Sequence, residues 1–305
     1  EKVDTEPSEK VEEKPSEKVN SEEENYFFGP EEEANFEVVA KIGEGMTSVV
    51  YKLVDKRTMV PLCKKVLKVE SASFKDLQNA MKEFEVLHRL HHPCICSAIA
   101  INTSEVLSEE EEVTTVALFI EFIDFTLKDC LSKNMLNSTL KTRIIVELSH
   151  ALRYLHSKNM IYRDLKVSNI MLNSVYQVKL IDFGLVRINE CLFGEEMMNT
   201  ISMTKGIGDS LFMSPEMMRE EEYDNKTDVF SFGIVLYFIF LGKMPGQTMK
   251  EKAMGKQIKL PEVSPSVNKC CIDLMSKCLD SDPKERPSFN EILTILRDNK
   301  FMLAD

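Results

Sequence analysis

The chain contains no long apolar run, although it has 305 residues. Its longest apolar stretch, from Val229 to Leu241, covers 13 residues and is interrupted by Ser231 and Gly233. A helix that spans a bilayer needs about 20 mostly apolar residues. This stretch therefore predicts a buried core helix and a protein with no membrane partner. The first residues are polar as well, so we expect no secretory signal peptide.

Basic residues are too few to give the chain a cationic face. The net charge is −12, and residues 1–35 alone contribute −9, because they hold 13 acidic residues and 4 lysines. The remainder carries a net charge of only −3. Attraction to nucleic acid through bulk charge is therefore not expected. The content of 43% hydrophobic and 29% charged residues is typical of a globular protein.

The eight cysteines include no C-x-x-C pair. This absence removes the most common spacing of zinc sites and of redox-active dithiols. We therefore predict reduced thiols and a cytoplasmic location.

The N-terminal part has a composition that opposes folding. The pentapeptide PSEKV occurs at residues 7–11 and again at 15–19, and Glu, Lys, Ser and Pro dominate residues 1–25. Such a segment cannot bury enough apolar surface to offset the entropy lost on ordering. We predict a disordered acidic tail over residues 1–35, acting as a solvated linker or as a docking tail, and a folded domain over residues 36–305.

Apolar residues at helical spacing predict two helices after the tail. Residues 76–90 place Met81, Phe84, Leu87 and Leu90 on one face, and residues 138–157 repeat the same spacing. Apolar runs at 36–40 and 116–123 predict strands. Mixed elements of this kind indicate an α+β fold.

The most informative stretch runs from residue 161 to residue 184 and contains two acids. Asp164 is followed by Lys166 and Asn169, and Asp182 follows two short apolar runs that predict a β-hairpin. Phosphoryl transfer requires metal ions, a cation and a group that orients the attacking hydroxyl. Carboxylate and amide oxygens are ligands that Mg²⁺ prefers. These residue types therefore favour phosphoryl transfer.

A glycine-containing segment near the start of the predicted domain supports this interpretation. Gly43 and Gly45 are followed by Val50. Glycines let the backbone approach phosphates closely, with N–H groups directed at them. A pair of lysines, Lys64 and Lys65, lies on the strand expected next.

Together these motifs resemble those of the eukaryotic protein kinases. Besides Asp-Leu-Lys-x-x-Asn at 164–169 and Asp-Phe-Gly at 182–184, the chain has Ser-Pro-Glu at 214–216, Asp-Val-Phe-Ser-Phe-Gly at 228–233 and Asp-Pro-Lys-Glu-Arg-Pro at 282–287. The resemblance covers residues 36 to about 297. It implies a bilobal α+β fold, with a small β-rich N-lobe (about 36–123) that holds one main helix and a larger, mainly helical C-lobe (about 124–305). It also implies a buried ion pair between Glu216 and Arg286.

The resemblance implies an ATP- and Mg²⁺-dependent transfer of phosphate to a protein substrate. Asp164 would orient the attacking hydroxyl and accept its proton, Lys166 would neutralise charge on the γ-phosphate, and Asn169 and Asp182 would hold Mg²⁺. The lysine at position 166 is typical of Ser/Thr kinases rather than tyrosine kinases. The sequence at 230–233 points to the tyrosine-kinase-like group of Ser/Thr kinases.

The resemblance also implies a nucleotide site on the N-lobe side. Lys65 rather than Lys64 is expected to hold the phosphates, because the small Cys63 then lies two residues earlier on the same strand face, against adenine. Glu83 would pair with Lys65. The full set of expected nucleotide-binding residues is Ile42, Gly43, Glu44, Gly45, Val50, Cys63, Lys65, Glu83, Ile120, Glu121, Ile123 and Asp182.

Residues 182–216 are expected to form a regulatory activation segment. Thr200, Ser202 and Thr204 are candidate phosphorylation sites, and Arg163 would bind the phosphate. The family usually has Gly-Thr where this chain has Gly-Asp-Ser at 208–210. Asp209 would repel Asp164, and Ser210 is an alternative source of the missing hydroxyl.

Two alternatives to an active kinase stay open at this point. One is a pseudokinase that binds nucleotide without transfer, for which Asp209 is the main argument. The other is a scaffold that acts only through its acidic tail.

Overall fold

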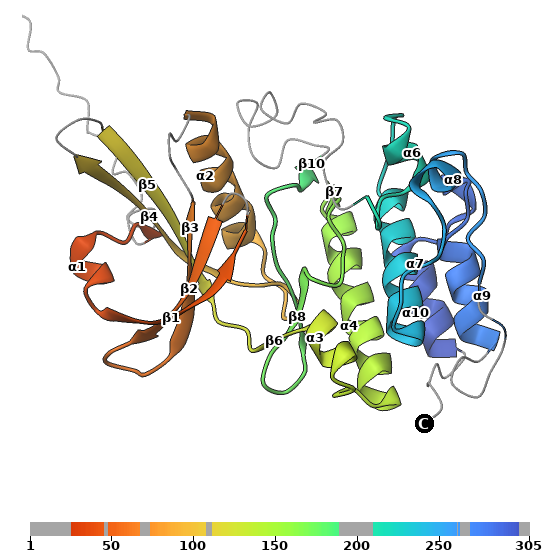
Figure 1. The fold of residues 1–305 in the computed structure, drawn as a ribbon, viewed down its shortest axis with the longest axis horizontal. Helices are drawn as coiled ribbons and strands as arrows, with labels where there is room; N and C mark the ends of the chain where they lie inside the picture. The colour runs from red at the N-terminus through yellow and green to blue at the C-terminus, as the bar shows by residue number, and fades with distance from the viewer. Residues whose placement is uncertain are drawn as a thin grey trace, which may run out of the picture.

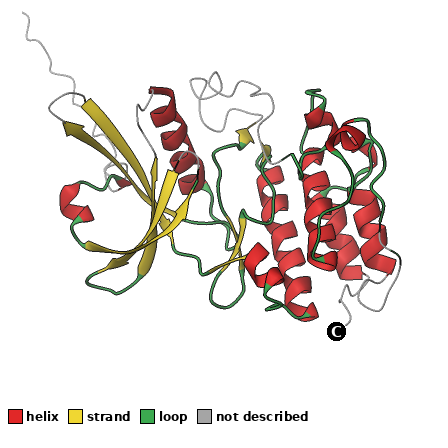
Figure 2. Cartoon of the chain, viewed as in Figure 1, coloured by secondary structure: helices red, strands yellow, loops and turns green. Residues whose placement is uncertain are grey.

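The computed structural model describes residues 26–45, 48–67, 74–107, 112–188, 210–260, 262 and 269–298. Figure 1 shows a sheet-containing lobe beside a helical lobe, and Figure 2 shows the strands concentrated in the first. The predicted bilobal α+β fold is therefore confirmed. The elements are α1 (Pro30–Glu33), β1 (Phe36–Glu44), β2 (Ser48–Asp55), β3 (Pro61–Leu67), α2 (Phe74–Arg89), β4 (Ala98–Leu107), β5 (Glu112–Glu121), β6 (Phe125–Thr126), α3 (Leu127–Ser132), α4 (Ser138–Ser157), β7 (Met160–Ile161), β8 (Ile170–Leu172), β9 (Val178–Leu180), β10 (Arg187–Ile188), α6 (Pro215–Met218), α7 (Lys226–Leu241), α8 (Met249–Ala253), α9 (Lys269–Cys278), the 3₁₀ helix η2 (Pro283–Glu285) and α10 (Phe289–Asp298).

The N-lobe is an antiparallel sheet of five strands in the order β1-β2-β3-β5-β4. Its two faces carry separate small cores, since alternate side chains of a strand point to opposite faces. One core contains Leu53, Leu62, Ala100, Ala117 and Phe119. The other contains Ile101, Val116 and Leu118 with Ala80 and Phe84 of α2. Each core is small, and α2 contributes only Ala80 and Phe84 to the second of them.

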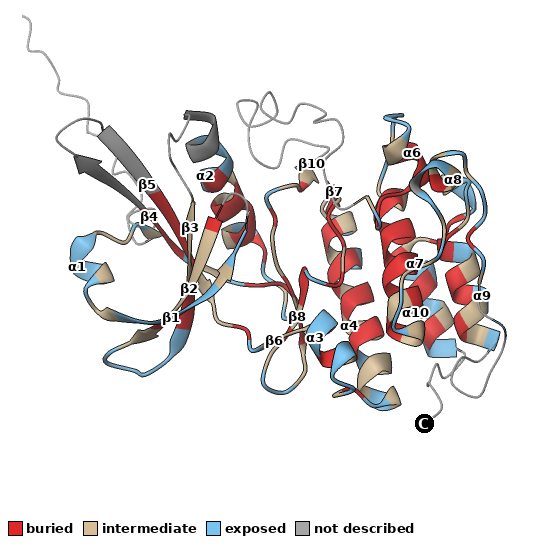
Figure 3. Ribbon diagram, in the orientation of Figure 1, coloured by how far each residue is buried: buried red, intermediate tan, exposed pale blue. Residues whose placement is uncertain are grey.

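The C-lobe is built around α4 and α7. Helix α7 is buried on nearly every side, as its red colour in Figure 3 shows. A methyl group at Gly233 would lie 2.7 Å from the Leu279 side chain, so glycine permits the close approach of the chain segment that follows α9. Gly242 ends α7 with a φ of 64°, a left-handed conformation that glycine adopts without strain. The apolar run at 229–241 is thus a buried core helix, as predicted.

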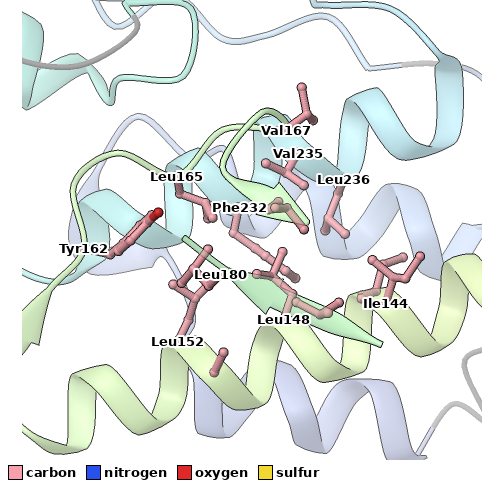
Figure 4. Close-up of a cluster of buried hydrophobic side chains, with 14 of the residues drawn as sticks. Ile144, Leu148, Leu152, Tyr162, Leu165, Val167, Leu180, Phe232, Val235 and Leu236 are labelled. Carbon is pink, nitrogen blue, oxygen red and sulfur yellow. The ribbon is translucent and has the colours of Figure 1, made fainter. Parts of the chain in front are cut away.

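The hairpin of β8 and β9 lies on the large core of the C-lobe. Strands β8 and β9 pair antiparallel, which confirms the predicted hairpin. Figure 4 shows Tyr162, Leu165 and Val167 among the buried side chains of the same cluster as Leu148 and Leu152 of α4. Polar residues lie between these three apolar ones, so the loop backbone is held in place by the side chains that it buries in the core.

The structure corrects the predicted boundary of the tail. Residues 26–35 pack on the N-lobe: Phe28 N–H donates to the Ile101 carbonyl at 2.9 Å, and Phe28 stacks on Phe36 at 5.5 Å between ring centroids. The prediction of disorder is therefore wrong for residues 26–35. Three consecutive aromatic side chains at 26–28 provide apolar area that the preceding repeat lacks. Residues 1–25 lie outside the described residues.

The predicted helices agree with the structure except at one face position. Helix α4 has the predicted bounds, and α2 begins two residues early and ends at Arg89. Met81, placed on the apolar face by the spacing argument, is 42% exposed, because the buried face is centred on Ala80, Phe84 and Leu87. Among the residues that the structure describes, no helix is both long enough and apolar enough to cross a membrane.

Candidate active site

The loop between β7 and β8 brings three of the predicted catalytic residues into direct contact. The Asp164 carboxylate is only 5% exposed and accepts hydrogen bonds from Lys166 Nζ and from Asn169 Nδ2, both at 2.7 Å. Asn169 Nδ2 also lies 3.0 Å from the backbone carbonyl of Asp164. One ammonium and one amide thus fix the orientation of a buried carboxylate.

A second buried acid holds the start of this loop. Asp228 of α7 accepts hydrogen bonds from the backbone N–H groups of Tyr162 and Arg163, each at 2.9 Å, and lies 2.8 Å from His156 Nε2. Its side chain is completely buried. Arg163 has a φ of 67°, a strained conformation for a non-glycine residue. The bonds to Asp228 stabilise that conformation and so place Asp164.

Across the cleft, Lys65 faces two acids. Its Nζ lies 2.7 Å from Glu83 Oε1 of α2 and 3.5 Å from Asp182 Oδ1. Burial alone would lower the pKa of the Lys65 ammonium, but the two carboxylates outweigh burial and raise its pKa above the ordinary value. The lysine therefore stays charged in a nearly dry site, as a group that binds phosphate oxygens must.

Lys64 lies on the opposite face of β3 from Lys65. It forms an ion pair with Glu33 of α1 and lies over the Phe119 ring. Strand alternation accounts for this split, because adjacent residues of a strand point to opposite faces. Of the two lysines between which the sequence left a choice of register, only Lys65 contacts Glu83.

A cavity of about 310 Å³ lies between these groups and the segment that joins the lobes. Ten of the twelve residues expected to bind nucleotide line it. They are Ile42, Gly43, Val50, Cys63, Lys65, Glu83, Ile120, Glu121, Ile123 and Asp182. Glu44 and Gly45 do not line it: Glu44 forms an ion pair with Lys41, and Gly45 N–H donates to the Ser48 carbonyl at 2.8 Å.

Seven further residues line the cavity that the sequence argument did not assign to it. They are Ser48, Leu87, Cys96, Leu118, Thr126, Met171 and Ile181. Strand alternation could have identified Leu118, because it lies two residues before Ile120 on β5 and therefore on the same face of that strand. Cys96 and Leu87 could not have been found in this way, since they come from the loop and helix behind the sheet.

The walls of this cavity are apolar beside its charged end. Burial raises the pKa of the Cys63 thiol to about 11, so the thiol is protonated near neutral pH. A neutral thiol on β3 is a small, weakly polar surface suited to contact with a planar ring. The cavity therefore combines an apolar slot with an end that carries one lysine and two carboxylates.

Asp182 has the features of a cation ligand. Its side chain is 44% exposed. Its backbone φ of 62° is left-handed, so the chain leaves the extended conformation of β9 at this residue. Asn169 supplies an amide on the same side of the cleft. An accessible carboxylate and an amide oxygen form an oxygen donor set that fits Mg²⁺.

The segment after Asp182 is described only at its two ends. Arg163 Nε donates to the Leu185 carbonyl at 2.5 Å and its NH1 to the Tyr223 hydroxyl at 3.0 Å. Thr200, Ser202, Thr204 and Asp209 lie outside the described residues. At the far end, the buried ammonium of Lys252 in α8 donates to the carbonyls of Ser210 and Leu211 at 3.2 and 2.6 Å.

A buried ion pair anchors the end of this segment in the C-lobe. Arg286 binds Glu216 through two bonds of 2.6 and 2.9 Å, and both residues are almost completely buried. Arg286 also lies 4.9 Å from the Phe230 ring centroid. The ion pair predicted between these two residues is confirmed.

Comparison with known proteins agrees with this geometry. A family model described as protein kinase domain matches residues 36–295. A probable serine/threonine-protein kinase of Dictyostelium discoideum is 29% identical over 287 residues, which cover 91% of this chain and 29% of that protein. Dual specificity protein kinase pyk3 of the same organism is 31% identical over 86% of this chain and 18% of its own length. Serine/threonine-protein kinase 36 of Mus musculus is 30% identical over 85% of this chain and 19% of its own length. The chain thus spans less than a third of each of these relatives.

Proposed function

The chain belongs to the protein kinase family, and from this premise we propose that it transfers the γ-phosphate of ATP to serine or threonine hydroxyls of protein substrates. The observation that carries the proposal is the contact of Asp164 with both Lys166 and Asn169, opposite the Lys65–Glu83 pair. This arrangement supplies the carboxylate, the cations and the oxygen ligands that phosphoryl transfer needs.

In this proposal the C-lobe residues act on the attacking hydroxyl. Asp164 accepts a hydrogen bond from the substrate hydroxyl, orients its oxygen and takes its proton as the bond to phosphorus forms. Lys166, already 2.7 Å from Asp164, neutralises charge on the transferred phosphoryl group. Asn169 keeps the Asp164 carboxylate in one orientation, since its amide donates to that side chain.

The N-lobe residues position the nucleotide. The adenine ring fits the apolar slot between Val50, Cys63 and Met171, and Lys65 binds the phosphates nearer to the ring. Glu83 holds Lys65 in place, because the two side chains share two contacts below 3.0 Å. Asn169 and Asp182 would hold Mg²⁺, which shields the phosphate charge when bound.

The names of the similar proteins support serine or threonine as the phosphate acceptor. Two of the three relatives above are described as serine/threonine kinases, and the third as a dual specificity kinase. Lys166, which follows the catalytic aspartate by two residues, is typical of the serine/threonine type. We also propose that phosphorylation at Thr200, Ser202 or Thr204 regulates the activity, with Thr204 as the favoured site.

Transfer of labelled phosphate tests the proposal directly. The full chain is incubated with γ-labelled ATP, Mg²⁺ and a peptide library, and the labelled amino acid is identified after hydrolysis. Phosphoserine or phosphothreonine supports the proposal. Label on tyrosine alone would contradict the choice of acceptor.

The variant Asp164→Asn provides the matched control. It keeps the shape of the side chain but removes the proton acceptor, so transfer should fall by about 10²- to 10⁴-fold. ATP binding, measured by thermal shift with and without Mg²⁺, should change little. If the wild-type chain is stabilised by ATP but transfers no phosphate to any peptide, the protein is a pseudokinase and the proposal is wrong.

A further inference from the structure

Residues 26–35, here called the N-terminal strap, precede the segment matched by the family model and contact the helix that carries Glu83. The Tyr26 ring lies 3.9 Å from the His88 ring and 6.5 Å from the Phe84 ring, measured between centroids. Phe84 and His88 stack on each other at 5.5 Å with an angle of 16° between their planes. Tyr26 therefore extends an aromatic pair that one face of α2 presents.

The two residues that follow Tyr26 attach the strap to the sheet. Phe27 forms a bridge with Ile101 of β4, and Phe28 N–H donates to the Ile101 carbonyl at 2.9 Å. The Phe28 ring packs between Phe36 and Phe119, at 5.5 and 5.0 Å. Tyr26 and Phe28 thus contact the two different cores of the sheet, which places the strap across its β4 edge.

A polar contact fixes the other end of the strap. Glu33 of α1 forms an ion pair with Lys64 of β3 and accepts a hydrogen bond from Asn102 Nδ2 of β4 at 2.7 Å. Figure 1 shows α1 on the side of the sheet away from the C-lobe, whereas α2 lies toward the C-lobe. The strap therefore joins the outer face of the sheet to α2.

These contacts act on the same helix that positions the catalytic lysine. Phe84 directly follows Glu83, and His88 lies a little more than one turn further along α2. The C-terminal part of α2 also packs on the large core through Val86, Leu87 and Leu90. Tyr26 adds a contact on a different face, so it opposes rotation of α2 about its axis, the motion that would withdraw Glu83 from Lys65.

We propose that the N-terminal strap is a positioning element of the active site, and that Tyr26, through Phe84 and His88 of α2, holds Glu83 against Lys65. Tyr26 touches neither nucleotide nor substrate in this scheme and acts only through α2. The catalytic unit accordingly begins near Tyr26 rather than at Phe36. The kinetic part of this inference rests on the proposed kinase function, whereas its structural part does not.

Hydrogen exchange in the full chain tests the structural part. Three variants are compared with the wild type: Tyr26→Ala, Tyr26→Phe and Phe27→Ala. Tyr26→Ala should speed exchange of the α2 amides about 3- to 10-fold, the factor that corresponds to loss of one aromatic contact. Tyr26→Phe keeps the ring and should restore wild-type exchange. Phe27→Ala is the matched control, because the Phe27 ring is itself 53% exposed, and it should leave α2 unchanged.

A double-mutant comparison tests the kinetic part. Tyr26→Ala should lower kcat by up to the same 3- to 10-fold factor in the wild-type background, and should have no further effect in a Glu83→Gln background. A loss of global stability would instead reduce activity equally in both backgrounds. If the chain proves to transfer no phosphate, the exchange experiment still decides the inference.

The inference is overturned by either of two results. One is α2 exchange in Tyr26→Ala equal to that in Phe27→Ala. The other is faster exchange spread equally over β3, β5 and α2, which would show that Tyr26 stabilises the whole lobe and does not position α2.

Discussion

In the C-lobe the loop that carries Asp164 rests on one large core, whereas in the N-lobe the buried side chains of the sheet divide between two small clusters on its opposite faces. Asp164 is fixed by Lys166 and Asn169 beside it and by fully buried Asp228 beneath the loop. Glu83 depends on the placement of one helix. The two halves of the cleft are therefore stabilised by different amounts of buried contact.

This difference has a physical consequence for regulation. Moving the catalytic loop would expose a large apolar surface and break charge-assisted bonds to Asp228, both of which are costly. Rotating α2 would disturb fewer buried side chains, namely Ala80 and Phe84 in a small core and three residues near its C-terminal end in the large core, together with one ion pair. Structural change is thus cheaper on the N-lobe side, and that is where the strap makes its contact with α2.

The largest expected effect is a difference in phosphate transfer between variants of Lys65 and of the adjacent Lys64 in the N-lobe. Lys65→Met removes the cation that faces Glu83 and Asp182, so phosphate transfer should fall by at least about 10²-fold, as when one group that stabilises developing charge is lost. Lys64→Met removes a contact to Glu33 on the other sheet face and should reduce transfer only a few-fold. Steady-state assays of both variants on one peptide check this, and a reversed order would contradict the assignment of Lys65.

The next effect concerns the stability of the C-lobe. Arg286→Met leaves the buried Glu216 carboxylate without its partner and should lower the free energy of unfolding by about 3–5 kcal/mol. Urea denaturation followed by circular dichroism measures this loss. The double variant Glu216→Leu with Arg286→Met removes both charges and should recover most of the lost stability. Equal losses in the single and double variants would show that the charges do not interact.

A smaller effect is expected near the end of the segment that closes at Glu216. Lys252→Met removes two hydrogen bonds that a buried ammonium donates to the carbonyls of Ser210 and Leu211, and leaving these acceptors unpaired should cost about 1–3 kcal/mol. The peptide KM should rise while the ATP KM stays constant, because Ser210 and Leu211 lie within the segment that ends at Glu216. Lys250→Met on the exposed side of α8 is the control. An equal rise of both KM values in Lys252→Met would contradict a local role.

The sequence predicts the parts of the fold in which local pattern and packing agree. Helix α4 repeats its apolar spacing without interruption, and the hairpin of β8 and β9 alternates cleanly. The Glu216–Arg286 pair is predicted from two motifs that lie far apart in the sequence and come into contact only in the folded protein. Here the family resemblance supplied the tertiary information that spacing alone lacks.

The sequence misses the parts that depend on tertiary contact alone. Residues 26–28 follow a low-complexity run, and their packing depends on β4 having a free edge, which composition cannot reveal. Met81 is misplaced because a rotation of α2 by one residue moves it from the core to solvent. Glu44 likewise does not line the cavity, and its carboxylate pairs with Lys41 instead.

The smallest effect tests how redundantly the C-lobe half of the site is held. The Tyr162 hydroxyl donates to the Ile181 carbonyl, directly before Asp182, and its ring packs on Phe183 at 5.3 Å. Burial raises the pKa of this hydroxyl well above its ordinary value, so it donates at all physiological pH values.

Tyr162→Phe keeps the ring contact and removes only this hydrogen bond, at a net cost of about 0.5–1.5 kcal/mol. Because Asp228 still binds the backbone at positions 162 and 163, Asp164 should keep its place, and transfer should fall by less than about tenfold. Affinity for Mg²⁺-ATP, measured by titration, should weaken by a similar small factor, since the lost bond adjoins Asp182. A fall in transfer as large as that of Lys65→Met would mean that a single hydroxyl holds the C-lobe half of the site. The proposed difference in stability between the two lobes would then be wrong, because the site residues of the C-lobe would depend on a single contact as much as those of the N-lobe do.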